Sequence, residues 1–168
     1  DMIIVTFSKS FGGVGGCLYA REDLTNYVNW YARSRMFSCA LDPAITGGLI
    51  KVLELAAGPD GKAKRERIRR NADYMRSKLQ GQVDIGSSHS WIIPVIYGDE
   101  HISILLSDYL QHQGMDVSLM SFPAVPKNKS RIRLFVTSEH TKEQMDKGAE
   151  AILKAAEHFG FRLEDQQA

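Results

Sequence analysis

A single lysine lies in the most glycine-rich stretch of the chain, between two short apolar runs. The stretch reads Thr6-Phe7-Ser8-Lys9-Ser10-Phe11-Gly12-Gly13-Val14-Gly15-Gly16. Hydroxyl groups and backbone N–H groups suit a phosphate, and glycines let the backbone approach a ligand closely. A lysine held in such a loop can form a Schiff base with an aldehyde. From the residues alone, a ligand-binding loop and an ordinary solvated turn both remain open.

An arginine on a predicted strand is the second candidate. Residues 131–137 alternate, with Ile132, Leu134 and Val136 on one face and Arg131, Arg133, Phe135 and Thr137 on the other. An arginine fixed on a strand presents a planar fork that binds a carboxylate through two hydrogen bonds. The alternative interpretation of Arg133 is an ordinary surface charge.

Ser38 is the third candidate, because it lies shortly before a predicted helix start. Pro43 suits the first turn of that helix and Asp42 is a good N-cap for it. A helix N-terminus with a serine nearby can bind an anion. A capped helix start without any ligand explains the same residues.

Apolar spacing predicts the elements that position these residues. Helices are expected over residues 23–31, 44–57, 62–80, 101–113 and 141–158. Strands are expected over residues 2–5, 17–20, 91–97, 115–120 and 131–137, the first of them buried. Residues 58–61 should break the chain, and the polar tail after Phe161 should fray.

Three local details sharpen these predictions. Asp23 or Thr25 is expected to cap the first helix. Pro94 places its strand at the edge of a sheet or next to a bulge. Thr141 and Gln144 form a capping-box pattern at the start of the last helix.

Bulk properties exclude several classes of function. With 168 residues the chain can bury a core, and its net charge of +1 argues against nucleic acid as a partner. No apolar run approaches the length of a membrane span. The histidines are scattered, so no metal is expected. Cys17 and Cys39 form no disulfide framework, and a reducing cytoplasm is the expected location.

Several motifs together resemble one enzyme family. The stretch from Thr6 to Gly16 is similar to the lysine segment of the α-oxoamine synthases, which reads Thr-Phe-Ser-Lys-Ser-Phe-Gly followed shortly by Gly-Gly. Residues 89–99 resemble the family's His-X-Ile-Ile-Pro-Val-X-X-Gly-Asp, and residues 131–141 resemble its Arg-Ile-Arg segment followed by His-Thr. These enzymes depend on pyridoxal phosphate (PLP) and have the aspartate-aminotransferase fold, called fold type I.

The resemblance implies a role for each candidate residue. Lys9 would be the catalytic lysine that binds PLP covalently and transfers protons, and Thr6 would contact the cofactor phosphate. Arg133 would hold the α-carboxylate of the amino-acid substrate. Ser38 matches a segment that reaches into the partner's site of a homodimer and touches the PLP phosphate there. In that segment, Cys39 and Ala40 replace residues that usually bear a hydroxyl or an amide.

The resemblance also implies an α/β fold, namely the C-terminal part of a fold-type I PLP enzyme with a small α+β C-terminal domain. Residues 1–57 would then belong to the large PLP-binding domain and the start of the linking helix. Residues 58–168 would form the rest of that helix and the small domain. Family enzymes carry a large portion before the lysine, including groups that bind the PLP ring. We therefore expect the chain alone to bind PLP weakly.

The implied activity is that of a biosynthetic transferase. It would be a PLP-dependent acyltransferase that condenses an amino acid with an acyl-CoA or another acyl thioester, usually with loss of CO₂, to give an α-aminoketone. Members include 8-amino-7-oxononanoate synthase, 5-aminolevulinate synthase, serine palmitoyltransferase and glycine C-acetyltransferase, and residues 89–99 lean toward the last. Two alternatives remain open: an aminotransferase of the same fold type, and a non-catalytic fragment or partner subunit.

Overall fold

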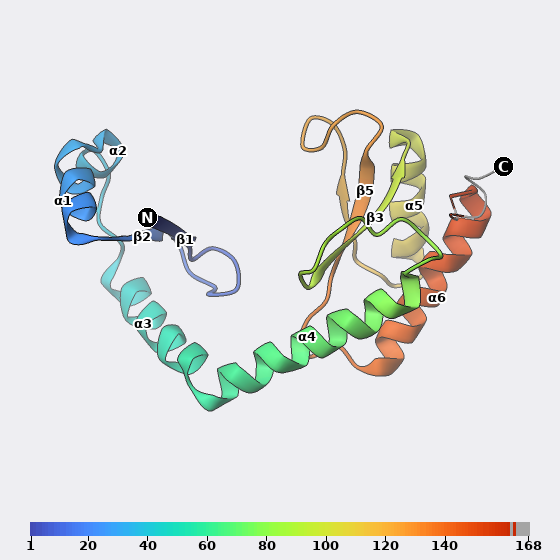
Figure 1. Cartoon of the computed structure of the whole chain (residues 1–168), viewed down its shortest axis with the longest axis horizontal. Coiled ribbons are helices and arrows are strands. Elements are labelled where there is room, and N and C mark those ends of the chain that lie inside the picture. Colours follow the sequence, from blue (N-terminus) through green and yellow to red (C-terminus); the bar gives the residue numbers. More distant parts are fainter. Residues whose placement is uncertain (162, 164–168) are drawn as a thin grey trace. The chain divides into compact units, whose positions relative to one another are not determined.

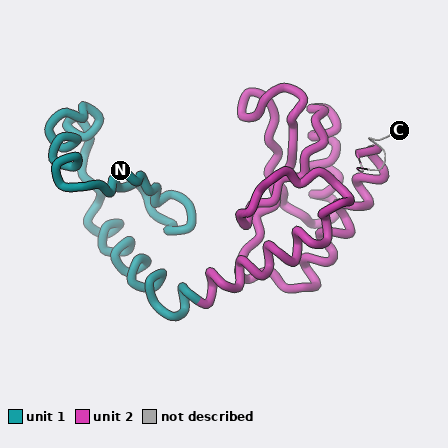
Figure 2. Tube along the Cα trace, in the orientation of Figure 1, with its two compact units in different colours: residues 1–62 teal, residues 63–168 magenta. Residues whose placement is uncertain are grey.

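The computed structural model describes residues 1–161 and 163, which form two compact units (Figure 2). Residues 1–62 make the first unit and residues 63–168 the second. Most of the predicted polar tail after Phe161 lies outside the described residues. None of the helices in the described part of the chain combines the length and apolar character needed to cross a membrane.

The first unit begins with an antiparallel strand pair. β1 (Met2–Thr6) pairs with β2 (Gly16–Ala20) so that Met2 faces Ala20 and Thr6 faces Gly16. Both strands were predicted, but the expected burial of the first is wrong. Ile4 is 83% exposed, because the sheet consists of these two strands and no described element covers that side chain.

Three helices follow in the first unit, namely α1 (Glu22–Tyr31), α2 (Arg33–Met36) and α3 (Pro43–Ala57) (Figure 1). Neither Asp23 nor Thr25 caps α1 as expected. The helix begins one residue earlier, with Arg21 at the N-cap and no side-chain cap, and the Thr25 hydroxyl donates back to the Arg21 and Glu22 carbonyls. The hydroxyl therefore bonds within the first turn, where it cannot serve as a cap.

The start of α3 confirms the prediction. An oxygen of Asp42 accepts hydrogen bonds from the backbone N–H groups of Ala44 and Ile45, at 2.8 and 3.3 Å. Pro43 occupies the first helical position, where its missing N–H costs no hydrogen bond.

The long helix α4 (Pro59–Leu79) starts three residues before the predicted position. Gly58 ends α3 through hydrogen bonds to the carbonyls of Glu54 and Leu55, and the chain turns helical again at once, with Pro59 in the first turn. The predicted break over residues 58–61 is therefore limited to Gly58, and Pro59 already starts the next helix. The domain boundary predicted after residue 57 stays a prediction.

The second unit contains a three-stranded antiparallel sheet with the order β3-β5-β4. These strands are β3 (Ile92–Gly98), β4 (Ser118–Met120) and β5 (Ser130–Phe135). Pro94 lies on the edge strand β3, as predicted. β4 is shorter than predicted, because Met115 still donates its N–H to the Leu110 carbonyl at the end of α5 (Glu100–His112).

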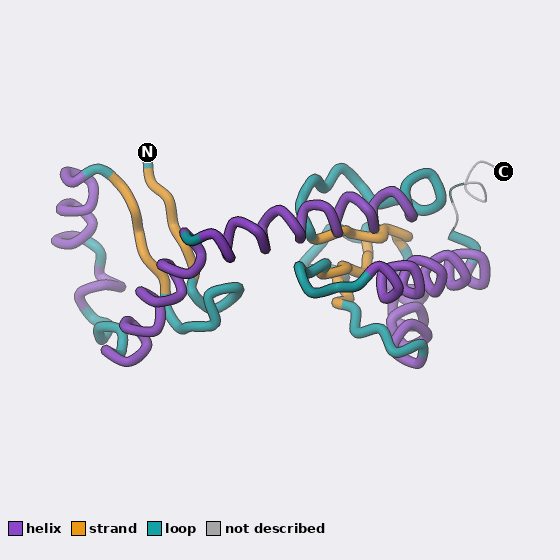
Figure 3. The backbone as a smooth tube through the Cα atoms, turned by 90° about the horizontal axis from the view of Figure 1, so that it is seen from below, coloured by secondary structure: helices purple, strands orange, loops and turns teal. Residues whose placement is uncertain are grey.

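Helices cover one face of this sheet. The alternating side chains Ile93, Val95, Ile132 and Leu134 are buried together with residues of α4, α5 and α6 (Lys142–Phe159). Figure 3 shows these helices in purple and the strands in orange. The other face of β5 carries Arg131, Arg133 and Phe135, which remain partly exposed. The sheet therefore has a covered apolar face and an open face that bears the candidate arginine.

The predicted capping box of α6 is confirmed. Thr141 Oγ1 accepts from the Gln144 N–H at 3.2 Å, and Gln144 Oε1 accepts from the Thr141 N–H at 2.9 Å. Gly160 closes the helix in the left-handed conformation with φ 67°.

Candidate functional site

The lysine loop joins β1 to β2 and is fixed by its own backbone. The Phe7 N–H donates to the Gly15 carbonyl at 2.9 Å, and the Gly13 N–H donates to the Phe7 carbonyl at 2.8 Å. The Lys9 carbonyl accepts from the Gly12 N–H at 2.9 Å, which closes a tight turn after the lysine. Lys9 itself is exposed, so its amine is open to a ligand.

Two hydroxyl groups lie beside each other at the start of this loop. Thr6 Oγ1 and Ser8 Oγ are 2.9 Å apart, and Thr6 Oγ1 also lies 3.4 Å from the Ser8 N–H. Both residues are exposed. The chain thus presents hydroxyls and a primary amine within four consecutive residues.

Two glycines of the loop are required by the packing of the chain itself. A Cβ atom built on Gly13 would lie 2.8 Å from Leu49 Cδ2, and one on Gly16 would lie 2.5 Å from the Val5 carbonyl oxygen. At these two positions the space is filled by the chain itself. Gly13 and Gly16 therefore let the loop close on α3 and let the two strands approach, whereas Gly12 and Gly15 adopt positive φ values of 63° and 92°.

Phe7 anchors the loop, and sequence reasoning did not single it out. Its side chain is only 7% exposed and meets Phe11 edge to face, with ring centroids 5.9 Å apart. The signal available in the sequence was an aromatic residue on either side of Lys9. Such a pair fixes the path of the loop around an exposed lysine.

Ser38 lies in the segment between α2 and α3. Its hydroxyl donates to the Arg35 carbonyl at 3.3 Å, and the residue is exposed. Its neighbour Phe37 is 84% exposed, which is unusual for so large an apolar side chain. Ser38 and the loop of Lys9 belong to the first unit, whereas Arg133 belongs to the second.

Arg133 lies at the centre of the open sheet face. Its Nη2 donates to Ser118 Oγ at 3.0 Å, and its guanidinium carbon lies 5.2 Å from the centroid of the Phe135 ring. Its Nε is buried and has no hydrogen-bond partner among the described residues. Arg131, two residues earlier, instead donates its Nε–H to the Lys129 carbonyl at 3.0 Å.

The turn after β5 is held by a polar network. His140 Nδ1 accepts from the Thr137 N–H at 3.1 Å, and Asn71 Nδ2 of α4 donates to the carbonyls of both Thr137 and His140. Because its Nδ1 accepts this hydrogen bond, a neutral His140 carries its proton on Nε2.

Glu139 in the same turn lies 3.4 Å from Lys64 Nζ and 3.8 Å from Arg67 Nη1, both of α4. The Ser138 hydroxyl and, next, Lys64 lower the pKa of Glu139. The His-Thr part of the sequence motif thus builds the turn that follows the candidate arginine.

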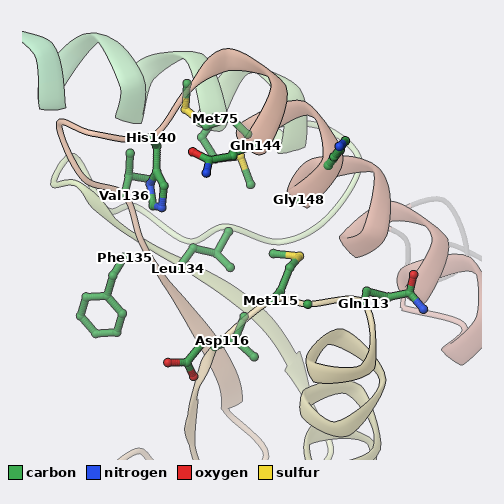
Figure 4. Close-up of a pocket in the computed structure, with 14 residues that line it drawn as sticks. Met75, Gln113, Met115, Asp116, Leu134, Phe135, Val136, His140, Gln144 and Gly148 are labelled. Carbon is green, nitrogen blue, oxygen red and sulfur yellow. The ribbon is translucent and has the colours of Figure 1, made fainter.

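A pocket of about 390 Å³ opens in the second unit (Figure 4). Its lining side chains come from α4, β5, α6 and the segment after α5, and they include Met75, Met115 and Met145. The lining of this pocket includes none of the predicted site residues, which are Thr6, Lys9, Ser38 and Arg133. Within residues 1–161 and 163, no three histidine, cysteine, aspartate or glutamate side chains gather in a way that could hold a metal ion.

Comparison with known proteins gives consistent matches along the chain. The family described as aminotransferase class I and II matches residues 1–152. The 8-amino-7-oxononanoate synthase of Thermoanaerobacter pseudethanolicus is 37% identical over 164 residues, which are 97% of this chain and 40% of that protein. The erythroid-specific mitochondrial 5-aminolevulinate synthase of Bos taurus is 30% identical over 98% of this chain and 28% of its own length. The chain therefore spans less than half the length of these relatives.

Solved structures with the same fold cover nearly the whole chain. Serine palmitoyltransferase from S. paucimobilis matches 95% of this chain and 40% of its own, with a TM-score of 0.86 and 24% identity. The 8-amino-7-oxononanoate synthase from Francisella tularensis matches 94% of this chain and 46% of its own, with a TM-score of 0.77 and 22% identity. The predicted fold class is confirmed.

Proposed function

This chain belongs to the aminotransferase class I and II family, and we propose that it serves a PLP-dependent condensation of an amino acid with an acyl-CoA or another acyl thioester. The product would be an α-aminoketone, usually with loss of CO₂. The observation that carries the proposal is the exposed Lys9 beside the paired hydroxyls of Thr6 and Ser8. Relatives named 8-amino-7-oxononanoate synthase and 5-aminolevulinate synthase, which align with nearly the whole chain, support it.

The residues present fit PLP. Lys9 offers an exposed primary amine for the aldehyde, and the hydroxyls of Thr6 and Ser8 offer hydrogen bonds to the phosphate. When bound, PLP supplies an electron sink that stabilises a carbanion at the substrate Cα. Lys9 is then the group that carries the proton to and from that carbon.

Arg133 would hold the carboxylate of the amino-acid substrate. Its Nη1 and the second hydrogen of its Nη2 are not used by Ser118, so they can take a carboxylate end-on. Phe135 lies against the guanidinium, which suits a cation held in place rather than one moving in water.

Ser38 would act in a second copy of the chain, as a contact to the cofactor phosphate in a homodimer with shared sites. The exposed Phe37 beside it supports an interface at this segment. Since Cys39 and Ala40 lack the usual polar groups, Ser38 would be the one residue of this segment that contacts the phosphate. Because Cys17 and Cys39 are exposed free thiols, the reducing cytoplasm remains the proposed location.

An absorbance titration of the chain with excess PLP, before and after borohydride reduction, tests the central step. We expect a covalent adduct that borohydride traps on Lys9 and that peptide mapping locates there. The Lys9→Ala variant should lose the adduct. Lys51→Ala, which removes another exposed lysine of the same unit, should keep it. Equal trapping on unmodified chain and Lys9→Ala would refute Lys9 as the cofactor residue.

An aminotransferase is the second candidate, since the matching family is described by that activity. It would share Lys9 and Arg133 but release no CoA. Assays of amino acids with acyl-CoAs and with keto acids separate the two candidates. Keto-acid exchange without thioester consumption would favour the aminotransferase, and no turnover of either kind by the PLP-loaded protein would favour a non-catalytic role.

A further inference from the structure

Ser118 is the residue directly opposite Arg133 in the sheet. The register of β4 and β5 pairs the two residues, so their side chains emerge side by side from the same face. The guanidinium Nη2 donates to the Ser118 hydroxyl at 3.0 Å, and both side chains are half-buried. The contact joins residues 15 positions apart in the sequence.

The charge of Arg133 is left unpaired by this arrangement. No acidic side chain in the described part of the chain forms an ion pair with it, whereas Arg76 is paired with Asp73 at 2.6 Å and Arg67 lies 3.8 Å from Glu139. Ser118 is neutral, so it fixes the direction of the guanidinium without neutralising it. Phe135 supports the guanidinium from another side, at 5.2 Å from its ring centroid.

Only the far end of the guanidinium remains available to a ligand. Nε is buried, and one hydrogen of Nη2 is used by Ser118, which leaves Nη1 and the other hydrogen of Nη2. Two parallel hydrogen bonds to a carboxylate need a fixed plane, because the fork binds only when both N–H groups point at the two oxygens. The orientation set by Ser118 therefore decides whether the fork can be used.

We propose that Ser118 is a positioning residue for carboxylate binding, which holds the Arg133 guanidinium in the plane that an α-amino-acid carboxylate requires. The proposal rests on the proposed function of Arg133 as the substrate anchor. It assigns Ser118 no contact with the reacting atoms.

The first test measures the guanidinium itself, by NMR of the Arg133 Nε–H signal in the full chain without cofactor. In the unmodified chain we expect a protected signal with restricted motion. Ser118→Ala should make it more mobile and faster to exchange with water, and Ser118→Thr, which keeps the hydroxyl, should restore it. Ser107→Ala on α5 removes a serine hydroxyl that makes no hydrogen bond with Arg133, and it should leave the signal unchanged. An equally ordered guanidinium in Ser118→Ala would overturn the proposal.

The second test measures the steady-state kinetics of the PLP-loaded protein. Losing one orienting hydrogen bond should raise KM for the amino acid about 3- to 10-fold, with KM for the acyl thioester unchanged and the value restored in Ser118→Thr. If Arg133→Ala strongly raises KM for the amino acid and Ser118→Ala leaves it unchanged, the positioning role of Ser118 is refuted and the role of Arg133 as the anchor is not. An unchanged KM in Arg133→Ala would refute Arg133 as anchor, and Ser118 with it.

Discussion

Leu49 occupies the space into which a side chain on Gly13 would point. A Cβ built on Gly13 would lie 2.8 Å from Leu49 Cδ2, and Leu49 is itself only 5% exposed, within α3. The loop that carries Lys9 therefore packs directly on this helix. The contact fixes the loop because the leucine has little room to move away.

Gly13→Ala should loosen this loop. The added methyl group would overlap Leu49, so either the leucine or the loop must shift, at a cost of about 1–3 kcal/mol. We expect a lower melting temperature and weaker trapping of PLP on Lys9. Thermal unfolding and the borohydride assay measure the two effects.

Gly47→Ala is the matched control for that substitution. Gly47 lies on the same helix as Leu49, and a Cβ there would meet nothing within 4 Å. Alanine in an open helix position should stabilise the chain by up to about 1 kcal/mol. If both variants lower the melting temperature equally, crowding at Leu49 is not the cause.

Asn71 ties α4 to the turn after β5, and its removal should destabilise the second unit. The side-chain amide donates to the Thr137 carbonyl at 2.9 Å and to the His140 carbonyl at 3.1 Å. Asn71→Ala loses both hydrogen bonds, and we expect a loss of about 1–2 kcal/mol in the free energy of unfolding. Urea unfolding measures the loss.

The isosteric variant Asn71→Asp separates the hydrogen bonds from the shape of the side chain. At neutral pH it would turn a carboxylate oxygen toward two carbonyl oxygens, so it should destabilise at least as much as Asn71→Ala. Unfolding stability close to that of the unmodified chain would show that the two hydrogen bonds contribute little.

Local chemistry made part of this fold predictable. Asp42 followed by Pro43 gave the start of α3, and Pro94 placed its strand at a sheet edge. In each case the outcome depends on residues a few positions apart, such as a cap and the N–H groups that it accepts from. The alternation of apolar and polar residues around Arg133 predicted the two faces of β5, again because the pattern depends only on residues that are close in the sequence.

Contacts between distant residues were not predictable in this way. The apolar residues of β1 predict a strand, but whether anything covers it depends on other elements, and Ile4 is open. Ser118 attracted no notice in the sequence, because its contact with Arg133 depends on the register between two strands. Likewise, the glycines beside Lys9 predicted an unusual loop, but they could not show that Leu49 fills the space beside Gly13.

The capping box of α6 should contribute measurably to stability. Thr141→Ala removes the acceptor of the Gln144 N–H, and we expect a loss of about 1 kcal/mol in the free energy of unfolding. Thr141→Ser keeps the hydroxyl and should stay close to the unmodified chain. Thermal unfolding of the two variants checks the difference, and equal losses would mean that the hydroxyl is not the stabilising group.

Alkaline pH should destabilise the second unit through Tyr97. Burial raises the pKa of the Tyr97 hydroxyl from 10.0 to about 12. Ser103 donates its own hydrogen to the Asp99 carbonyl at 2.6 Å, and the Tyr97 hydroxyl has no hydrogen-bond partner among the described residues. The ionised form is therefore disfavoured in the folded chain.

The sign of the effect follows from the protons bound in each state. Between pH 10.0 and about 12 the unfolded chain has lost the Tyr97 proton while the folded chain keeps it, so stability falls as pH rises through this window. The slope is at most about 1.4 kcal/mol per pH unit, reduced because the side chain is only partly buried. Urea unfolding across the window should show the loss in the unmodified chain and in Tyr19→Phe, whose tyrosine is 72% exposed. Tyr97→Phe should lack this part of the loss, and an unchanged alkaline slope in that variant would assign the effect to another group.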